Sequence, residues 1–388
     1  MNTVHIALLG TGFAARFHAE AYRRIWGVQP VIHAVLGHTQ ASADAFAAAW
    51  GIPHAETDLD AILRDPAIDL VDIALPPRLH AQTILHVLEA GKSVACEKPL
   101  TGYFGRPEDP VPIGACVSRQ TMYDRLLPEL DALRTAVQHG PGRFFYAENY
   151  LYAPSIVRAG ELLKKKESRI LCIRAEVTIR GSTSPVAGSW AATGGGALIR
   201  LGCHPIAAIL YLKQQENPGV SVREVLASTA CISKDLTEKE RRHLTGHPED
   251  VEDFASLMIT FTDDTKALVV ASDHVFGGIR NQLEIFTNDG SLRCTLTPER
   301  QLESYWMDGA GLEGECLSEQ LQEVAGWNTV SVADTVLRGY QAQFQDFVEC
   351  TAFGREPVSG IEIACQTTQL IYAAYCSAQQ GSVIRIGQ

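Results

Sequence analysis

Arg200 and His204 stand four residues apart in the segment GGGALIRLGCHP, residues 194–205. On an α-helix this spacing places two side chains on one face. Arginine offers a planar fork of N–H donors and never deprotonates, whereas histidine changes its charge near neutral pH. The glycines before the pair leave backbone that a ligand can approach closely. The segment is therefore a candidate ligand site, and its chemistry depends on what the rest of the chain binds.

A glycine turn follows the first apolar run of the chain. Residues 4–9, VHIALL, predict a strand buried on both faces, and a helical pattern runs from the turn to Tyr22. In such a unit Gly10 makes a tight turn, Gly12 lets backbone N–H groups approach a pyrophosphate, and small Ala15 allows close helix packing. The alternative is a glycine turn without a nucleotide. The residues expected to bind a dinucleotide here are Gly10, Gly12, Phe13, Ala14 and Ala15.

The elements that must position this turn alternate along the first half of the chain. Further apolar strands are predicted at 31–36, 69–74 and 93–96, with helical stretches at 41–50 and 79–90 between them. Strands that alternate with helices predict a parallel, doubly wound sheet.

The choice between NAD and NADP depends on the end of the second strand, where an acid would bind the ribose hydroxyls of NAD and repel the extra phosphate of NADP. The sequence there is Leu36-Gly37-His38-Thr39-Gln40, without an acid. His38 and Thr39 can donate hydrogen bonds to a phosphate, so NADP is mildly favoured over NAD. No arginine at this strand end decides the matter. The predicted contacts are Gly37, His38 and Thr39.

Composition narrows the classes of partner. The 388 residues carry a formal net charge of -12, and the longest basic run is residues 164–166, which argues against nucleic acid or an anionic membrane. The start lacks a signal-peptide pattern, and no long uninterrupted apolar stretch predicts a membrane span, so we expect a cytoplasmic protein. The ten cysteines are dispersed, which favours reduced structural thiols.

Two further motifs carry a family resemblance. Leu75-Pro76-Pro77-Arg78-Leu79-His80 follows one predicted strand, and Cys96-Glu97-Lys98-Pro99-Leu100 follows the next. Together with the glycine turn they resemble the Gfo/Idh/MocA family, the glucose-fructose oxidoreductase and inositol dehydrogenase type. The resemblance extends through W-x-x-x-G-G-G at residues 190–196, His204, an acidic pair at 252–253 and a helix near IYAAYCSAQQG.

The resemblance implies an N-terminal Rossmann domain, residues 1–150, and an α/β domain with a large, mostly antiparallel open sheet, residues 151–388. The sequence agrees independently, because hairpin signals TDDT and NDG separate several predicted strands. These strands are 170–179, 222–232, 254–262, 266–273, 282–287 and 291–296. The apolar strand LMITFT leaves an exposed sheet face that suggests a homodimer or homotetramer.

In similar enzymes the lysine of the E-K-P motif hydrogen-bonds the reacting hydroxyl and the distal histidine acts as acid and base. The resemblance thus implies catalytic roles for Lys98 and His204, because hydride transfer from an alcohol needs a group that takes the hydroxyl proton. The lysine follows a parallel strand, at the edge where such sheets bind ligands. The expected cofactor contacts from these motifs are Pro76, Pro77, His80, Glu97 and Lys98.

Position 200 departs from the family, which usually has an aspartate four residues before the histidine. Arg200 either binds a carboxylate or another electron-rich group of the substrate, which suggests a sugar acid, or turns outward, or pairs with an acid such as Glu176. Six more residues are candidate walls of a sugar site, although core packing explains a lone Trp190 or Tyr152 equally well. These six are Asn149, Tyr150, Tyr152, Arg180, Trp190 and His274.

Other features leave alternatives open. The segment 102–118 looks inserted and either covers the active site, contacts a neighbouring subunit or is a plain surface loop. Gly and Pro interrupt the pair His243 and His247, so we expect no metal. The leading function is an NAD(P)-dependent dehydrogenase or reductase of a sugar, polyol or sugar acid. The alternatives are a redox-neutral NAD-dependent glycosidase and a catalytically silent ligand sensor.

Overall fold

The computed structural model describes residues 2–275, 279–297, 303–306, 326–329 and 338–387. The chain forms two compact units. Unit 1 contains Met1–Tyr152, Ala191–Gly194 and Gly339–Tyr372, and unit 2 contains Ala153–Trp190, Gly195–Arg338 and Ala373–Gln388. A single cut near residue 150 does not describe this division, because helix α11 (Tyr340–Phe353) packs on strand β1 of unit 1 and the division passes through helix α12 (Ile361–Gln380).

Unit 1 is built on a six-stranded sheet, and every neighbouring pair of strands is parallel. The strands in sheet order are β3 (His54–Glu56), β2 (Gln29–Leu36), β1 (Thr3–Leu9), β4 (Leu70–Ile73), β5 (Ser93–Glu97) and β6 (Phe144–Ala147). All residues of β4 and β6 are buried, as apolar runs predict for a parallel sheet. The predicted Rossmann sheet is confirmed.

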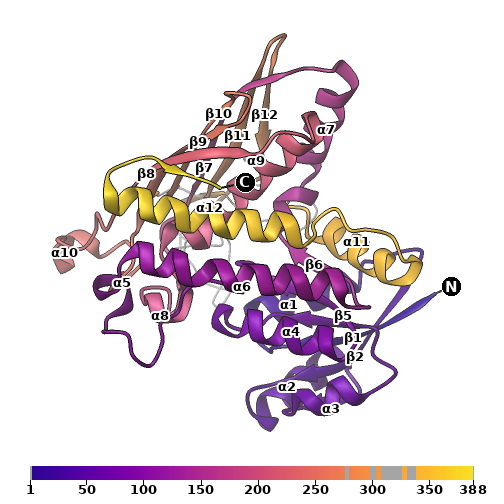
Figure 1. Ribbon diagram of the computed structural model, residues 1–388. Coiled ribbons are helices and arrows are strands. Elements are labelled where there is room, and N and C mark those ends of the chain that lie inside the picture. The colour runs from indigo at the N-terminus through magenta and orange to yellow at the C-terminus, as the bar shows by residue number, and fades with distance from the viewer. Residues whose placement is uncertain (1, 276–278, 298–302, 307–325, 330–337, 388) are drawn as a thin grey trace. The chain divides into compact units, whose positions relative to one another are not determined.

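Helices cover both faces of this sheet, because the crossovers from β1 to β2 and from β4 to β5 run in opposite directions along it. Helix α1 packs with α11, whereas α4 and α6 lie side by side (Figure 1). The helices of this part are α1 (Phe13–Tyr22), α2 (Gln40–Trp50), α3 (Leu59–Arg64), α4 (His80–Glu89), α5 (Ile113–Cys116) and α6 (Arg119–His139), with the 3₁₀ turns η1 (Pro77–Leu79) and η2 (Asn149–Tyr152).

Unit 2 is built on a seven-stranded, mostly antiparallel sheet, in which only β7 and β10 pair in parallel. The strands in sheet order are β12 (Ser291–Thr295), β11 (Arg280–Thr287), β7 (Ile170–Thr178), β10 (Lys266–Ser272), β9 (Phe254–Phe261), β8 (Val222–Ala230) and β15 (Ile384–Arg385). The mixed open sheet is confirmed, and each of its predicted strands forms within one to two residues of the expected bounds. Strands β13 (Glu303–Trp306) and β14 (Gly326–Thr329) pair separately.

One face of this sheet is covered by α9 (Cys203–Glu216), which packs on β7 and β10 beside α7 (Pro154–Lys166) (Figure 1). Shorter helices are α8 (Trp190–Thr193), α10 (Glu238–Arg241) and the π-helical turn η3 (Leu198–Gly202). The stretch Trp190–Glu216 is long and apolar enough to cross a membrane by composition alone, but 83% of its apolar window is buried in the protein. It has the environment of a core helix.

Candidate functional site

The two glycines of the first turn serve different needs. Gly10 has a φ of +118°, and a Cβ on it would lie 2.5 Å from the carbonyl oxygen of Ala74, so only glycine fits against the end of β4. Among the residues that the structure describes, a Cβ on Gly12 would meet nothing within 4 Å, and no side chain caps the start of α1. The first N–H groups of α1 are thus open to an anion. Ala15 is buried against the sheet as expected, Ala14 is partly exposed and Phe13 is 72% exposed.

At the end of β2 one of the expected residues, Thr39, caps a helix. A Cβ on Gly37 would lie 2.7 Å from the backbone nitrogen of Ala43. The Thr39 hydroxyl accepts a 3.2 Å hydrogen bond from the Ser42 N–H, and the Ser42 hydroxyl oxygen accepts one from the Thr39 N–H. This reciprocal pair starts α2. His38 is exposed.

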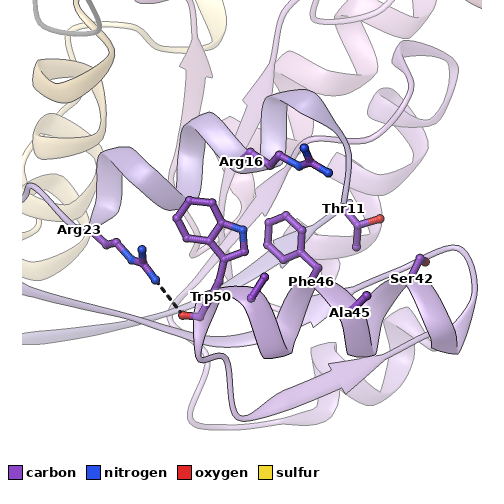
Figure 2. A pocket seen from close by; sticks show the side chains of 8 residues that line it. Thr11, Arg16, Arg23, Ser42, Ala45, Phe46 and Trp50 are labelled. Atoms are coloured by element: carbon purple, nitrogen blue, oxygen red, sulfur yellow. Dashed lines mark hydrogen bonds between the residues drawn. The ribbon is translucent and has the colours of Figure 1, made fainter. Parts of the chain in front are cut away.

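A hollow of about 530 Å³ lies between α1 and α2, beside this capped helix start. Its lining residues are Thr11, Arg16, Arg23, Ser42, Ala45, Phe46, Ala49 and Trp50 (Figure 2). Arg23 lies over the ring of Trp50, 4.4 Å from its centroid. Figure 2 shows Arg16, Thr11 and Ser42 toward the other end. In the residues that the structure describes, Arg16 makes no ion pair. Sequence reasoning missed this cation, because it enters from α1 and not from the strand end.

The motif after β4 is tied to the motif after β5 by His80. Pro76 and Pro77 begin η1, and His80 follows at the first position of α4. Its Nδ1 lies 2.8 Å from the Pro99 carbonyl oxygen and its Nε2 lies 2.9 Å from that of Leu75. Burial lowers the pKa of His80. Both ring nitrogens already have protein partners, and the predicted contact of His80 with a cofactor stays a prediction.

Lys98 directly follows β5 and is partly exposed. Its backbone N–H donates to Oε2 of Glu97 at 2.9 Å, and Oε1 of the same carboxylate lies 3.1 Å from Nε2 of the buried His18. Burial would raise the pKa of Glu97, but the hydrogen bond and charge of His18 hold it below its usual value. His18 is not among the predicted site residues, since a histidine inside an apolar helix pattern gives no sign of its partners.

Three of the wall candidates lie in η2. Asn149, Tyr150 and Tyr152 are all buried. The hydroxyl of Tyr152 donates to Oδ2 of Asp346 at 2.7 Å and accepts the N–H of Ser359 at 3.1 Å. These contacts explain Tyr152 by packing, and contact of η2 with a substrate stays a prediction.

The first residues of the inserted segment are packed in the protein. Residues 101–103 are buried, and the Tyr103 N–H donates to the hydroxyl of Tyr372 at 2.5 Å. The same hydroxyl donates to the Gly194 carbonyl oxygen at 2.7 Å, and a Cβ on Gly194 would lie 3.2 Å from the ring of Phe104. The start of the insertion is therefore anchored against Gly194 and is not a plain surface loop.

The other two glycines of the triplet give room to protein atoms. A Cβ on Gly195 would lie 2.2 Å from the hydroxyl oxygen of Tyr375, and one on Gly196 would lie 1.7 Å from the carbonyl oxygen of Glu252. The Glu252 carboxylate accepts the N–H groups of Gly196 and Leu198 at 2.9–3.1 Å and the Tyr375 hydroxyl at 2.8 Å. Burial raises the pKa of Glu252. The backbone here is thus closed by packing.

Arg200 and His204 do not share one regular α-helix. Arg200 lies in the π-helical turn η3, whereas His204 is buried near the start of α9. A π turn bonds residues five apart, so the face expected from α-helical spacing is rotated between them. Such turns are frequent at functional sites, which keeps the segment a candidate. The roles of Lys98 in unit 1 and His204 in unit 2 stay predictions.

The acid that pairs with Arg200 is Asp273, at the end of β10, rather than Glu176. Burial raises the pKa of Asp273 while Arg200 acts to lower it. Glu176 instead lies 3.8 Å from Arg280 and accepts the hydroxyl of Thr178. Arg200 and Asp273 therefore form a largely buried ion pair whose charges cancel.

A second ion pair adjoins the first in sequence. His274 Nε2 lies 3.0 Å from Oδ2 of Asp253, whose carboxylate also accepts the N–H groups of Ile232 and Ser233. The close Asp253 carboxylate raises the pKa of His274. Burial opposes ionisation of Asp253, yet its hydrogen bonds hold its pKa well below the usual value.

The remaining two wall candidates have contrasting settings in unit 2. The Arg180 carbonyl oxygen accepts the N–H and the hydroxyl of Thr245. Gly246 follows Thr245 in the chain, and a Cβ on Gly246 would lie 4.0 Å from Asp273. Arg180 thus belongs to the same neighbourhood as Arg200 and His274. Trp190 is fully buried with its ring 4.9 Å from that of Tyr375, a contact that packing explains.

Comparisons with known proteins agree with this organisation. Residues 4–109 match the model of an oxidoreductase family with an NAD-binding Rossmann fold, GFO/IDH/MocA, and residues 158–293 match its C-terminal domain. Levoglucosan dehydrogenase of Pseudarthrobacter phenanthrenivorans is 27% identical over 320 residues, which cover 75% of this chain and 73% of that protein.

Two solved structures share the fold. GenD2 from gentamicin A biosynthesis, in complex with NAD, matches with a TM-score of 0.79 and 22% identity, over 100% of this chain and 97% of that chain. A levoglucosan dehydrogenase in complex with NADH and levoglucosan matches with a TM-score of 0.74 and 21% identity over 100% of both chains.

Proposed function

Since the chain belongs to the Gfo/Idh/MocA family of oxidoreductases, we propose that it is an NAD(P)-dependent dehydrogenase or reductase of a neutral sugar or polyol. The supporting observation is in unit 1. The start of α1 at Gly12 follows β1, Lys98 follows β5, and both strands end at the same edge of one parallel sheet. Ligands of such sheets bind at that edge. A bound nicotinamide supplies the hydride chemistry.

The protein's own residues handle the hydroxyl group of the substrate. Lys98 donates a hydrogen bond to the reacting oxygen and stabilises the negative charge that develops on it. His204 takes the hydroxyl proton during oxidation and returns it during reduction. These two roles follow the family resemblance at the E-K-P motif and at position 204.

The ion pair at Arg200 favours a neutral substrate over a sugar acid. Arg200 is neutralised by Asp273, and an anionic substrate would have to compete with a carboxylate that is already in place. The pair together still offers donors and an acceptor, which suits the hydroxyl groups of a sugar or polyol. Asp273 thus places a carboxylate in this neighbourhood, but Arg200 balances its charge.

The α1–α2 hollow favours NADP. The Arg16 guanidinium and the hydroxyls of Thr11 and Ser42 lie near one another in it, beside the strand end that lacks an acid (Figure 2). An arginine with no acidic partner among the described residues binds a phosphate through a fork of donors. We therefore expect Arg16 to hold the extra phosphate of NADP.

The open face of the second sheet suits a homodimer or homotetramer. Leu226 and Leu268 are exposed there, and both pair in register with Met258 between them. An apolar band across three neighbouring strands is typical of a face that a second copy covers. Size-exclusion chromatography with light scattering tests this, with Leu268→Lys expected to yield monomers.

The test of the function is a rate screen of neutral sugars, polyols and sugar acids with NAD and NADP. We expect stoichiometric reduction of the cofactor by a neutral compound, and a loss of about 10²–10⁴-fold in Lys98→Ala but not in the exposed Lys164→Ala control. Arg16→Glu should raise KM for NADP and not for NAD. Product release without net cofactor reduction would favour the glycosidase, and binding without turnover would favour the sensor. If the wild type prefers sugar acids and Arg200→Asp abolishes that preference, the proposal of a neutral substrate is contradicted.

A further inference from the structure

A fully buried histidine stands between two carboxylates beneath the E-K-P motif. His18, on α1, has an exposure of 0%. Its Nδ1 lies 2.9 Å from Oδ2 of Asp72 on β4, and its Nε2 lies 3.1 Å from Oε1 of Glu97 on β5. The hydroxyl of Tyr22 also donates to Asp72, at 2.9 Å. One imidazole ring therefore joins the glycine-turn helix to two neighbouring strand ends.

This geometry fixes the charge of the ring. A neutral imidazole carries one N–H, so its second nitrogen would point a lone pair at a carboxylate oxygen about 3 Å away. Both contacts are favourable only when both nitrogens carry protons. Burial alone would lower the pKa of His18, but the charges and hydrogen bonds of Asp72 and Glu97 outweigh it and raise the pKa to about 10.

Further side chains of unit 1 border the cluster. The ring of Phe344 on α11 lies 4.5 Å from that of His18, and the buried thiol of Cys96 lies on β5 next to Glu97. The remaining oxygen of Glu97 accepts the backbone N–H of Lys98 at 2.9 Å. A chain of contacts thus runs from α1 through His18 and Glu97 to Lys98.

We propose that His18 is a positioning residue for Lys98: by holding the Glu97 carboxylate with one ring nitrogen and Asp72 with the other, it fixes the Lys98 backbone relative to the helix that starts at the glycine turn. Without the ring, two buried carboxylates would lack their shared cation. Glu97 would then protonate or turn toward solvent and release the Lys98 N–H. The proposal rests on the proposed function for the meaning of Lys98 in catalysis.

Kinetics of matched variants test the proposal. His18→Asn and Glu97→Gln should each lower kcat by about 10- to 100-fold, because small displacements of a reacting group cost that much, and KM for the sugar should change by less than about threefold. The control is His33→Asn, which removes another histidine–aspartate contact of the same sheet, to Asp65 at 3.1 Å, and should keep kcat within about twofold.

A double variant separates positioning from general destabilisation. If His18 acts through Glu97, then His18→Asn/Glu97→Gln should be no slower than the slower single variant within about twofold. Additive losses in kcat, or a folded His18→Asn with a kcat within about twofold of the wild type, would overturn the proposal.

A readout without turnover keeps the proposal testable if the proposed function fails. Lysines are methylated with ¹³C-formaldehyde, and the resonance of Lys98 is assigned by its loss in Lys98→Arg. We expect this resonance to shift in His18→Asn and in Glu97→Gln, and to stay in place in His33→Asn. Glu97→Gln decides alone if His18→Asn does not fold. An unmoved resonance overturns the positioning role, whereas a wild type without any hydride transfer overturns only the proposed function.

Discussion

Each unit contains a cluster of buried charges, but the two clusters differ in solvent access. In unit 1 His18 lies between two carboxylates, with side-chain exposures of 0% for His18 and Asp72 and 14% for Glu97. In unit 2 the cations are separate, and Arg200 and His274 keep 16% and 22% of their side chains exposed. A fully desolvated ion cannot change partners cheaply, whereas a partly hydrated one can. The contacts of the first cluster are therefore harder to exchange than those of the second.

Removing one carboxylate of the unit 1 cluster should have the largest effect. Asp72→Ala leaves His18 and Tyr22 without their acceptor in a site closed to water, and should cost about 3–5 kcal/mol of unfolding free energy. Urea denaturation measures it. The control Asp65→Ala removes a half-exposed partner of His33 and should cost about 1 kcal/mol. Equal losses of unfolding free energy in the two variants would contradict the expectation that burial sets the size of the effect.

Breaking the unit 2 pair should have a smaller effect that a second change repairs. Arg200→Met leaves Asp273 largely buried without its cation and should cost about 2–3 kcal/mol. Arg200→Met/Asp273→Leu removes both charges and should recover most of that loss, as measured by the midpoint of urea unfolding. A double variant less stable than the single one would mean that Asp273 has another essential partner.

The pH dependence of stability should separate the clusters further. The pKa of His18 is about 10 in the folded chain against about 6.5 when unfolded, so its contribution is complete below pH 6.5 and is lost as pH rises toward 10. The slope in this window should be about 1.4 kcal/mol per pH unit from this group. Urea midpoints measured across the window should fall less steeply in His18→Asn than in the wild type. His274→Asn should change the slope less, and the reverse order would contradict the assignment.

The smallest effect should come from a polar contact outside both clusters. The exposed hydroxyl of Thr39 caps α2, and Thr39→Ala should cost about 1 kcal/mol, as caps commonly do. Thermal unfolding measures it, with Thr39→Ser as the variant that keeps the cap. A loss as large as that of Asp72→Ala would show that exposure is a poor guide to the cost of losing a polar contact here.

The sequence predicted the two sheets closely, because apolar runs and turn signals mark most of their strands in consecutive residues. The run 4–9 became β1, and the runs after TDDT and NDG became β10 and β12. The three-residue β3 escaped notice, since His54–Glu56 has no apolar run. The glycine turn was also readable, because the need for Gly10 arises from its own backbone angle and the strand beside it.

The sequence did not predict which charged side chains pair with one another. The sequence offered Glu176 as an acid for Arg200, and folding brought Asp273 instead. It gave no reason to join His18 with Asp72 and Glu97, which lie 54 and 79 positions away. The hollow that contains Arg16 forms only when α1 and α2 pack beside each other.

By itself the sequence determined the family, the alternation of strands and helices, and the lysine at the end of β5. Each of these depends on a short motif or a run of neighbouring residues. The tertiary structure alone decided which cation meets which carboxylate and how much water reaches them. Electrostatic energies depend on distances and solvent exposure across the fold, and a linear chain specifies these only after it has packed.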